Sequence, residues 1–176
     1  MQERLIGMKS TTGASPLFER SIMSHVSRIP FFTLAQANLK AMINLSASVK
    51  KSSLGEALVE LVNLRVSQIN GCGVCVDMHW RDLIRQGADP RHLNALPGWR
   101  EAPFFSPREC AALGWAEAVN ALPHRDDTDA AYTELAQHFD PSGIAELTYA
   151  VAVIKGWNVM NLSLRNQIPE VPQPGF

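Results

Sequence analysis

The sequence is poor in several features that mark whole classes of protein. Its 176 residues include three cysteines, which are too few and odd in number for a disulfide-rich secreted scaffold. Its 11 glycines and 11 prolines are too few for a fibrous or low-complexity chain. With 16 Lys and Arg against 17 Asp and Glu, the net charge of -1 gives no basic excess that would attract nucleic acid or an anionic membrane.

Long hydrophobic runs are also missing. The most apolar stretch, residues 147–154, is far shorter than the roughly 20 residues that a membrane-spanning helix needs. The N-terminus has no apolar segment behind a basic start, so no signal peptide is expected. We therefore expect a cytoplasmic protein with neither membrane nor nucleic-acid partners, and the length suffices for one domain with its own core.

Signals for helix starts recur along the chain. Ser53 with Glu56, and Ser106 with Glu109, have the spacing of a capping box. Four capping residues stand directly before a proline, which is typical of a helix N-terminus: Ser15–Pro16, Asp89–Pro90, Ser106–Pro107 and Asp140–Pro141.

Apolar residues between these signals recur at helical spacing, and no strand-like alternation is sustained. The helical pattern covers residues 32–49, 54–68, 107–122, 127–139 and 141–157. We therefore predict an all-α fold, a single-domain bundle of seven or eight helices over residues 1–166. The proline-rich residues 167–176 are predicted to form an extended tail.

Residues 68–79 contain the most informative motif. Cys72 and Cys75 form a Cys-x-x-Cys pair, and His79 follows four residues later. Because Gly71 is a typical helix terminator and an amphipathic stretch follows, both cysteines are predicted in the first turn of a new helix. Free N–H groups and the macrodipole stabilise a thiolate there. At spacings of three and four, Cys72, Cys75 and His79 share one helix face.

This arrangement suits reversible thiol–disulfide chemistry. One sulfur attacks and the second resolves, giving a Cys72–Cys75 disulfide. If the oxidant is a peroxide, the attacked thiolate first becomes a sulfenic acid. His79 is then the candidate donor of a proton to the leaving oxygen.

Glu60 is the second residue of interest, twelve positions before Cys72. It forms a polar stripe at helical spacing with Glu56, Asn63 and Ser67. One interpretation is a solvated helix face. The other is that the stripe faces the helix of the cysteines and that Glu60 relays protons to His79.

Two other interpretations of the cysteines remain open. Cys72, Cys75 and His79 supply three ligands that zinc accepts, although a closed structural site needs a fourth, and Cys110 and His92 are only lone candidates. Alternatively, both cysteines are small core residues. Cys110 itself is expected to be a buried, inert thiol.

The run from Glu60 to His79 resembles the core of the AhpD-like alkylhydroperoxidases, within the broader carboxymuconolactone decarboxylase superfamily. The shared pattern is Glu, eleven residues, Cys-x-x-Cys, three residues and His, and the match is strongest over residues 53–90. The resemblance implies an all-α fold whose subunits assemble as trimers or hexamers. It also implies a cofactor-free and metal-free peroxidase that acts on organic hydroperoxides, with electrons supplied by a thiol carrier such as a lipoylated protein.

The resemblance also implies roles for individual residues. Cys75 would be the peroxidatic sulfur and Cys72 the more exposed resolving sulfur, while Glu60 and His79 would form a proton relay. Val74 stands where some members have a second histidine. The decarboxylase branch of the superfamily acts without a Cys-x-x-Cys pair, so the resemblance disfavours its lactone chemistry for this chain. A decarboxylase or isomerase whose cysteines are regulatory is kept as an alternative within the superfamily.

Overall fold

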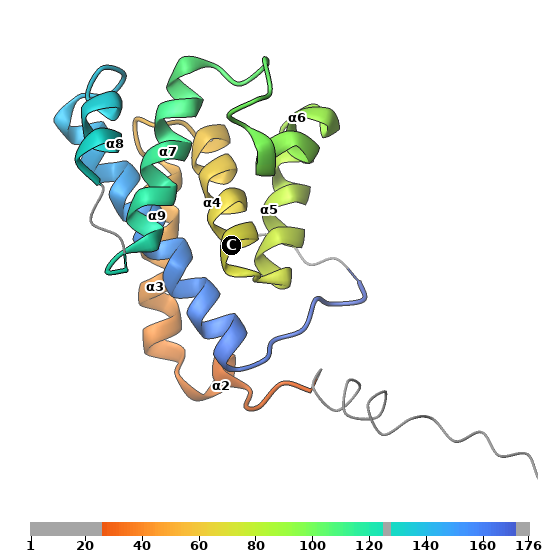
Figure 1. Cartoon of the computed structure of the whole chain (residues 1–176). Helices are drawn as coiled ribbons and strands as arrows, with labels where there is room; N and C mark the ends of the chain where they lie inside the picture. The colour runs from red at the N-terminus through yellow and green to blue at the C-terminus, as the bar shows by residue number, and fades with distance from the viewer. Residues whose placement is uncertain (1–25, 125–127, 172–176) are drawn as a thin grey trace, which may run out of the picture.

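The computed structural model describes residues 26–124 and 128–171, which contain helices and loops and no strand (Figure 1). Eight α-helices in this part of the chain confirm the predicted all-α class. None of these helices is both long and apolar enough to cross a membrane. The elements in chain order are α2 Phe31–Leu34, α3 Gln36–Lys50, α4 Glu56–Asn70, α5 Gly73–Arg85, α6 Pro90–Ala95, the 3-10 helix η1 Leu96–Gly98, α7 Pro107–Ala121, α8 Thr128–Leu135 and α9 Pro141–Ser163.

Three of the predicted helix caps are confirmed. Asp89 and Asp140 each accept a hydrogen bond from a backbone N–H in the first turn of α6 and α9. Ser106 and Glu109 form the complete capping box of α7. The predicted cap at Ser15 and the tail residues 172–176 lie outside the described residues.

The capping box predicted for Ser53 and Glu56 is wrong. Gly55 is the N-cap of α4, without a side-chain cap, and has a φ of 85° that favours glycine. This turn separates Ser53 from the helix start. The Ser53 hydroxyl instead donates to Glu146 Oε2 of α9 at 2.6 Å.

The helix predicted over residues 32–49 is divided in two. Ala35 has non-helical dihedral angles (φ −125°, ψ 48°), so α2 ends before α3 begins. The break lets the short α2 carry Phe31 into the core, where this ring is buried.

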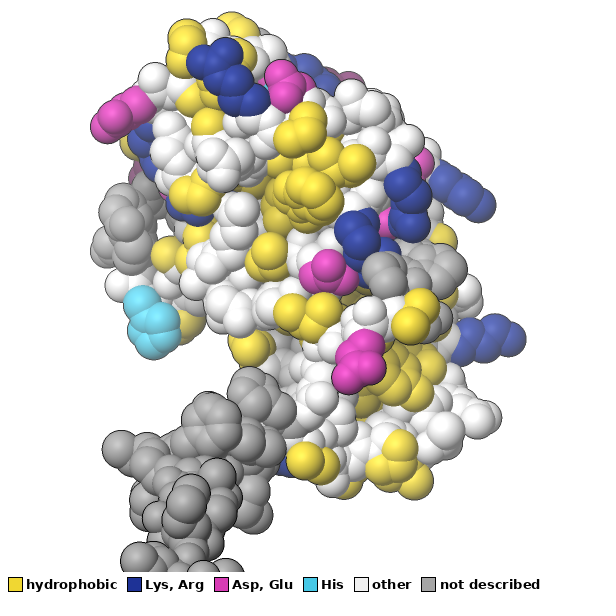
Figure 2. Space-filling model, turned by 90° about the vertical axis from the view of Figure 1, so that its right-hand side faces the viewer, with side chains coloured by type: hydrophobic (Ala, Val, Ile, Leu, Met, Phe, Trp, Pro, Cys, Tyr) yellow, Lys and Arg dark blue, Asp and Glu magenta, His cyan; other side chains and the backbone are white. Residues whose placement is uncertain are grey.

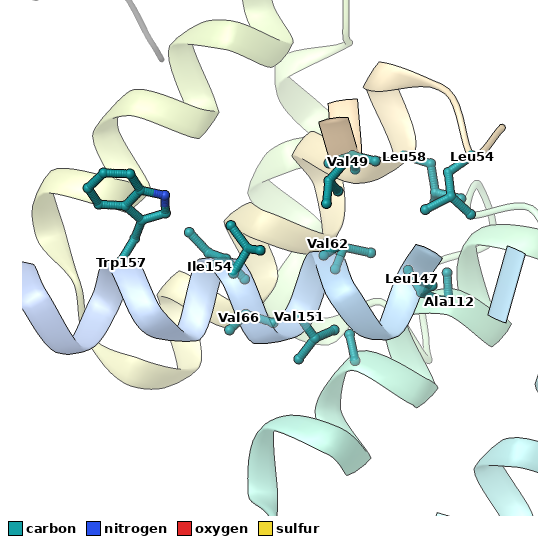
Figure 3. Packing of buried hydrophobic residues seen from close by; sticks show 14 of the residues in the cluster. Val49, Leu54, Leu58, Val62, Val66, Ala112, Leu147, Val151, Ile154 and Trp157 are labelled. Atoms are coloured by element: carbon teal, nitrogen blue, oxygen red, sulfur yellow. The ribbon is translucent and has the colours of Figure 1, made fainter. Parts of the chain in front are cut away.

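Helix α9 forms the centre of the main core. It contacts α3, α4, α5 and α7, and its residues Leu147 and Val151 are fully buried one turn apart. Figure 3 shows Leu147 beside Ala112 of α7, and both α9 side chains belong to the same cluster as Val62 and Val66 of α4. Burial of each such side chain contributes about 1.5–3 kcal/mol.

The turn between α4 and α5 positions the motif of the cysteines. Gly71 ends α4 in the left-handed conformation (φ 73°), and the N–H of Cys72 donates to Ser67 O at 3.0 Å. Only two residues therefore separate α4 from α5, and the two helices pack along each other. One face of α4 is thereby directed at α5.

The segments flanking the bundle meet at the end of α9. The N–H of Arg28 donates to Leu164 O at 2.9 Å, and its guanidinium donates to Ser163 O at 3.0 Å. The chain after α9 then runs toward α5, where Ile168 lies against Gly73: a Cβ there would be 3.3 Å from Ile168 Cδ1. The start of α5 is thus bordered by segments from both ends of the described chain.

Candidate redox site

Cys72 and Cys75 form a disulfide at the start of α5, with Cα atoms 5.4 Å apart. Cys75 lies in the first turn of α5, as predicted, whereas Cys72 is the N-cap residue directly before the helix. The separation of the Cα atoms is usual for disulfides.

The two sulfur-bearing residues differ in what they face. Both are only 1% exposed, so the expectation that Cys72 is the more exposed cysteine is wrong, because both pack into the core around α4 and α9. Cys75, and not Cys72, lines a cavity of about 350 Å³. A small molecule in this cavity would therefore meet Cys75.

The cavity beside Cys75 is mainly apolar. Phe32, Val74, Met78 and Trp157 contribute to its wall. Asp77 and Arg81 also line it. They form an ion pair one turn apart on α5, with hydrogen bonds of 3.0 and 2.9 Å from the guanidinium to Asp77 Oδ2. The volume lies at the lower end of the range typical of small-molecule sites.

Glu60 and His79 meet inside the protein. Glu60 Oε2 lies 2.5 Å from His79 Nδ1, and Glu60 is 0% exposed. The interpretation of the polar stripe as a solvated face is therefore wrong at Glu60, because α5 packs over it. Ser67 of the stripe is also buried, where it accepts a hydrogen bond from Asn158, whereas Glu56 is exposed.

Two further charged residues complete this cluster. Lys50 of α3 places Nζ 2.9 Å from Glu60 Oε1 and 3.8 Å from Asp82 Oδ2. Asp82 also pairs with Arg85. Sequence analysis missed both residues: Asp82 could have been found from its position three residues after His79 on the same helix face, but no local pattern relates Lys50 to Glu60.

The electrostatics of the cluster keep Glu60 ionised. Burial by itself raises the pKa of Glu60, but the hydrogen bonds and charges of His79 and Lys50 outweigh burial and leave its pKa below the ordinary value. An ionised carboxylate only accepts hydrogen bonds, so the proton of the contact belongs to His79 Nδ1. Protons must then enter or leave the ring at Nε2, which is buried without a hydrogen-bond partner among the described residues.

A second, smaller cavity borders His79. Its volume of about 30 Å³ suffices for one water molecule, and Ser46, Lys50 and Asn63 are among its polar neighbours. Met78 and Trp157 line both this cavity and the larger one. The imidazole thus lies one layer of side chains from the cavity of Cys75.

Asn161 of α9 provides a polar contact to the disulfide. Its Nδ2 donates to Cys75 Sγ at 3.3 Å, and Asn166 Nδ2 donates to Asn161 Oδ1 at 2.8 Å. Both asparagines line the larger cavity. Sequence analysis missed them, because 86 residues separate Asn161 from Cys75 and asparagine near the end of a helix is common.

The structure does not assemble the zinc site considered from the sequence. The sulfurs of Cys72 and Cys75 are bonded to each other and so are not available as thiolate ligands. Within the described residues, the one three-residue group of potential ligands is Glu60, His79 and Asp82, with ligand atoms within 4.8 Å of one another. The Lys50 ammonium already lies against both of its carboxylates and supplies the positive charge that a cation would bring.

Cys110 lies apart from this site. It is half-buried and free, rather than fully buried as expected. Burial, with a smaller contribution from the neighbouring Glu109 carboxylate, raises the pKa of its thiol. This environment still favours the predicted inert thiol.

Comparison with known proteins identifies relatives of this fold. Residues 36–118 match the model of the carboxymuconolactone decarboxylase family. The uncharacterized protein YdfG of Bacillus subtilis (strain 168) is 31% identical over 140 residues, which cover 80% of this chain and 95% of YdfG.

Two solved structures are similar over most of the chain. A protein of unknown function from Agrobacterium tumefaciens, a putative antioxidant defence protein AhpD, has a TM-score of 0.79 and 33% identity, covering 82% of this chain and 99% of that one. An alkylhydroperoxidase AhpD core from Ralstonia eutropha JMP134, an uncharacterized peroxidase-related protein, has a TM-score of 0.69 and 20% identity, covering 88% and 83%. The second likeness concerns the fold alone.

Proposed function

Because this chain belongs to the carboxymuconolactone decarboxylase family and has the fold of its AhpD-like members, we propose that it is a thiol-dependent peroxidase. It reduces organic hydroperoxides through a dithiol–disulfide cycle of Cys72 and Cys75. The observation that carries the proposal is that Cys75 lines a cavity and lies one turn before His79 on α5, where His79 contacts the buried Glu60.

The cycle begins from the dithiol form. His79 Nε2 takes the proton of the Cys75 thiol, directly or through one water, and the thiolate attacks the terminal oxygen of the hydroperoxide. The O–O bond breaks, Cys75 becomes a sulfenic acid, and the departing alkoxide receives the proton from His79. The Cys72 thiol then attacks the sulfenic sulfur, forming the disulfide and releasing water.

Glu60 and Lys50 support this proton transfer. The ionised Glu60 holds His79 by its Nδ1–H, so the imidazolium that forms during the cycle is stabilised by an adjacent negative charge. Lys50 keeps Glu60 ionised in turn. Glu60 acts through His79 and does not touch the sulfur.

A second dithiol closes the cycle. One sulfur of the donor attacks the Cys72–Cys75 disulfide as a thiolate and forms a mixed disulfide. The second sulfur of the donor then attacks this mixed disulfide, so the donor leaves as a disulfide and both cysteines are reduced. The net reaction converts one hydroperoxide and one dithiol into an alcohol, water and a disulfide. Since Cys75 is reached through the cavity, a dithiol on a flexible arm, such as that of a lipoylated protein, suits this site better than a flat protein surface.

The test is consumption of cumene hydroperoxide with dihydrolipoamide as the donor. We expect Cys75→Ser to abolish turnover. Cys72→Ser, treated with hydroperoxide in the absence of the donor, should consume one equivalent and leave a sulfenic acid that dimedone traps. Cys110→Ser is the matched control and should retain turnover. Wild-type turnover in Cys75→Ser would refute the proposed nucleophile, and an activity that survives replacement of both Cys72 and Cys75 would favour a decarboxylase or isomerase.

The proposal includes assembly into a homo-oligomer, a trimer or hexamer. An apolar stripe of α9 supports it, since Tyr149 (61% exposed) and Val159 (57% exposed) lie on the same face as the exposed Ala152. Hydrophobic patches also occur between charged side chains on the face in Figure 2. Such patches are typical of interfaces.

Light scattering on the purified chain tests the assembly. We expect a mass of three or six subunits, and we expect Tyr149→Asp to lower it. Tyr132→Asp, the same exchange at a half-exposed position on α8, is the control. A monomeric wild-type chain at micromolar concentration would contradict the assembly but not the redox cycle.

A further inference from the structure

The steps above assign no role to Asn161, although its carboxamide contacts the sulfur at which they occur. We propose that the Asn161 amide is the hydrogen-bond donor that holds the Cys75 thiolate in the reduced protein, and that Asn166 is the positioning residue that orients it. This inference rests on the proposed function, because it deepens the account of the same sulfur.

The contact brings a donor from a distant element to the reacting atom. Asn161 Nδ2 lies 3.3 Å from Cys75 Sγ, a separation suited to the large sulfur atom. Asn161 belongs to α9 and Cys75 to α5. The donor is therefore independent of the N–H groups at the start of α5.

Asn166 determines which end of the Asn161 amide faces the sulfur. Its Nδ2 donates to Asn161 Oδ1 at 2.8 Å, and its backbone N–H donates to Asn161 O at 2.9 Å. The second contact fixes the loop after α9, where Arg165 adopts a positive φ of 55°. With Oδ1 engaged by Asn166, the nitrogen remains for the sulfur.

The strength of this hydrogen bond changes with the redox state. A disulfide sulfur is a weak acceptor, whereas a thiolate is a charged acceptor, and hydrogen bonds to charged groups are roughly twice as strong as neutral ones. The sulfur of a neutral thiol is likewise only a weak acceptor. The amide therefore favours the thiolate over both the thiol and the disulfide.

Other groups around Cys75 do not duplicate this donor. Asp77 and Arg81 line the same cavity but are paired with each other, and His79 on the same helix is the proton acceptor of the cycle. The lining residues from the other elements, including Trp157, Gln167 and Ser27, carry no charge. Among the described residues that line the cavity, Asn161 donates to the Cys75 sulfur.

The experiment measures the pH dependence of Cys75 reactivity in the full chain. Cys72→Ser with Cys110→Ser leaves Cys75 as the one thiol, and its rate of alkylation by iodoacetamide is followed against pH. We expect Asn161→Ala to raise the midpoint by about one pH unit, the equivalent of one hydrogen bond to a charged group. Asn161→Asp, which has the same shape but puts an acceptor and a negative charge in place of the donor, should raise it further.

Two more variants distinguish the orientation of the Asn161 amide from a general disturbance of the cavity wall. Asn166→Ala leaves Asn161 in place, and we expect an intermediate rise because the amide is free to turn. Gln167→Ala, which alters the same cavity wall, should leave the midpoint unchanged. Midpoints of Asn161→Ala and Asn161→Asp within about 0.2 unit of the parent would overturn the inference.

The outcome is distinguishable from failure of the proposed function. A raised midpoint together with undiminished peroxidase turnover in Cys75→Ser would sustain the thiolate donor and refute the peroxidase cycle. An unchanged midpoint with turnover lost in Cys75→Ser would refute the thiolate donor and sustain the peroxidase cycle. Should Asn161→Ala not fold, the isosteric Asn161→Asp and the more remote Asn166→Ala decide the question.

Discussion

Replacement of Glu60 by Gln tests the buried charge cluster most directly. The carboxylate is 0% exposed and receives the Nδ1–H of His79 on one oxygen and the ammonium of Lys50 on the other. A glutamine of the same shape removes the charge and turns one acceptor into a donor that faces another donor. We expect the variant to fold with lower stability.

The size of the loss follows from the surroundings of the two partners. Removing one member of a buried ion pair costs about 3–5 kcal/mol. Lys50 is partly exposed, and in the variant its Nζ still has Asp82 Oδ2 as a neighbour, at 3.8 Å in the wild type. We therefore expect a loss at the lower end of this range, about 3 kcal/mol. For a chain of this length, that corresponds to a melting temperature lower by about 6–12 °C.

Urea unfolding followed by circular dichroism measures this difference. Glu56→Gln is the matched control, because Glu56 lies one turn earlier on α4 and is exposed. It should cost no more than about 1 kcal/mol, from the loss of a negative charge in the first turn. A Glu60→Gln variant as stable as Glu56→Gln would refute the reasoning that the buried carboxylate is stabilised by its partners.

The pH dependence gives a second check on the same residue. The pKa of Glu60 in the folded protein is lower than the ordinary value of 4.5, as His79 and Lys50 outweigh the effect of burial. Its stabilisation is therefore fully present above pH 4.5 and is lost as the pH falls through the folded pKa. We expect the difference in unfolding free energy between wild type and Glu60→Gln to shrink below pH 4.5, and a constant difference would contradict this.

Three further predictions concern the rest of the molecule. Leu147→Ala should lower the free energy of unfolding by about 2–5 kcal/mol in urea titration, because its side chain is fully buried in the main core. A loss below about 1 kcal/mol would mean that the core closes over the cavity left by the leucine. Gly71→Ala should cost about 1 kcal/mol by the same measurement, since φ is 73° but no atom lies within 4 Å of the added Cβ. A much larger loss would indicate a clash. Cys110 should react with iodoacetamide at pH 7 more slowly than an unfolded control, as burial and Glu109 raise the pKa of its thiol, and equal rates would count against this.

Local features of the sequence determined the helical class and the placement of the cysteine motif. The caps at Asp89, Ser106 and Asp140 form within one turn of chain, so residue type and spacing predict them. Cys72 and Cys75 are three residues apart at a helix start marked by Gly71, and their pairing needs no distant partner. The cap predicted at Ser53 failed because Gly55 turns the chain and a distant carboxylate, that of Glu146, competes for the hydroxyl.

The tertiary structure alone decided which side chains surround the motif. A polar stripe such as that of Glu60 has the same period whether it faces water or another helix. Glu60 is a buried, ionised group only because α5 packs over it and Lys50 of α3 contacts its carboxylate. Asn161 reaches Cys75 from α9, a contact set by helix packing over a long span of chain. Hydrophobic periodicity specifies which face of each helix is buried, but the partners of a buried charge or sulfur depend on how the helices are aligned along one another, and that alignment is a property of the assembled core.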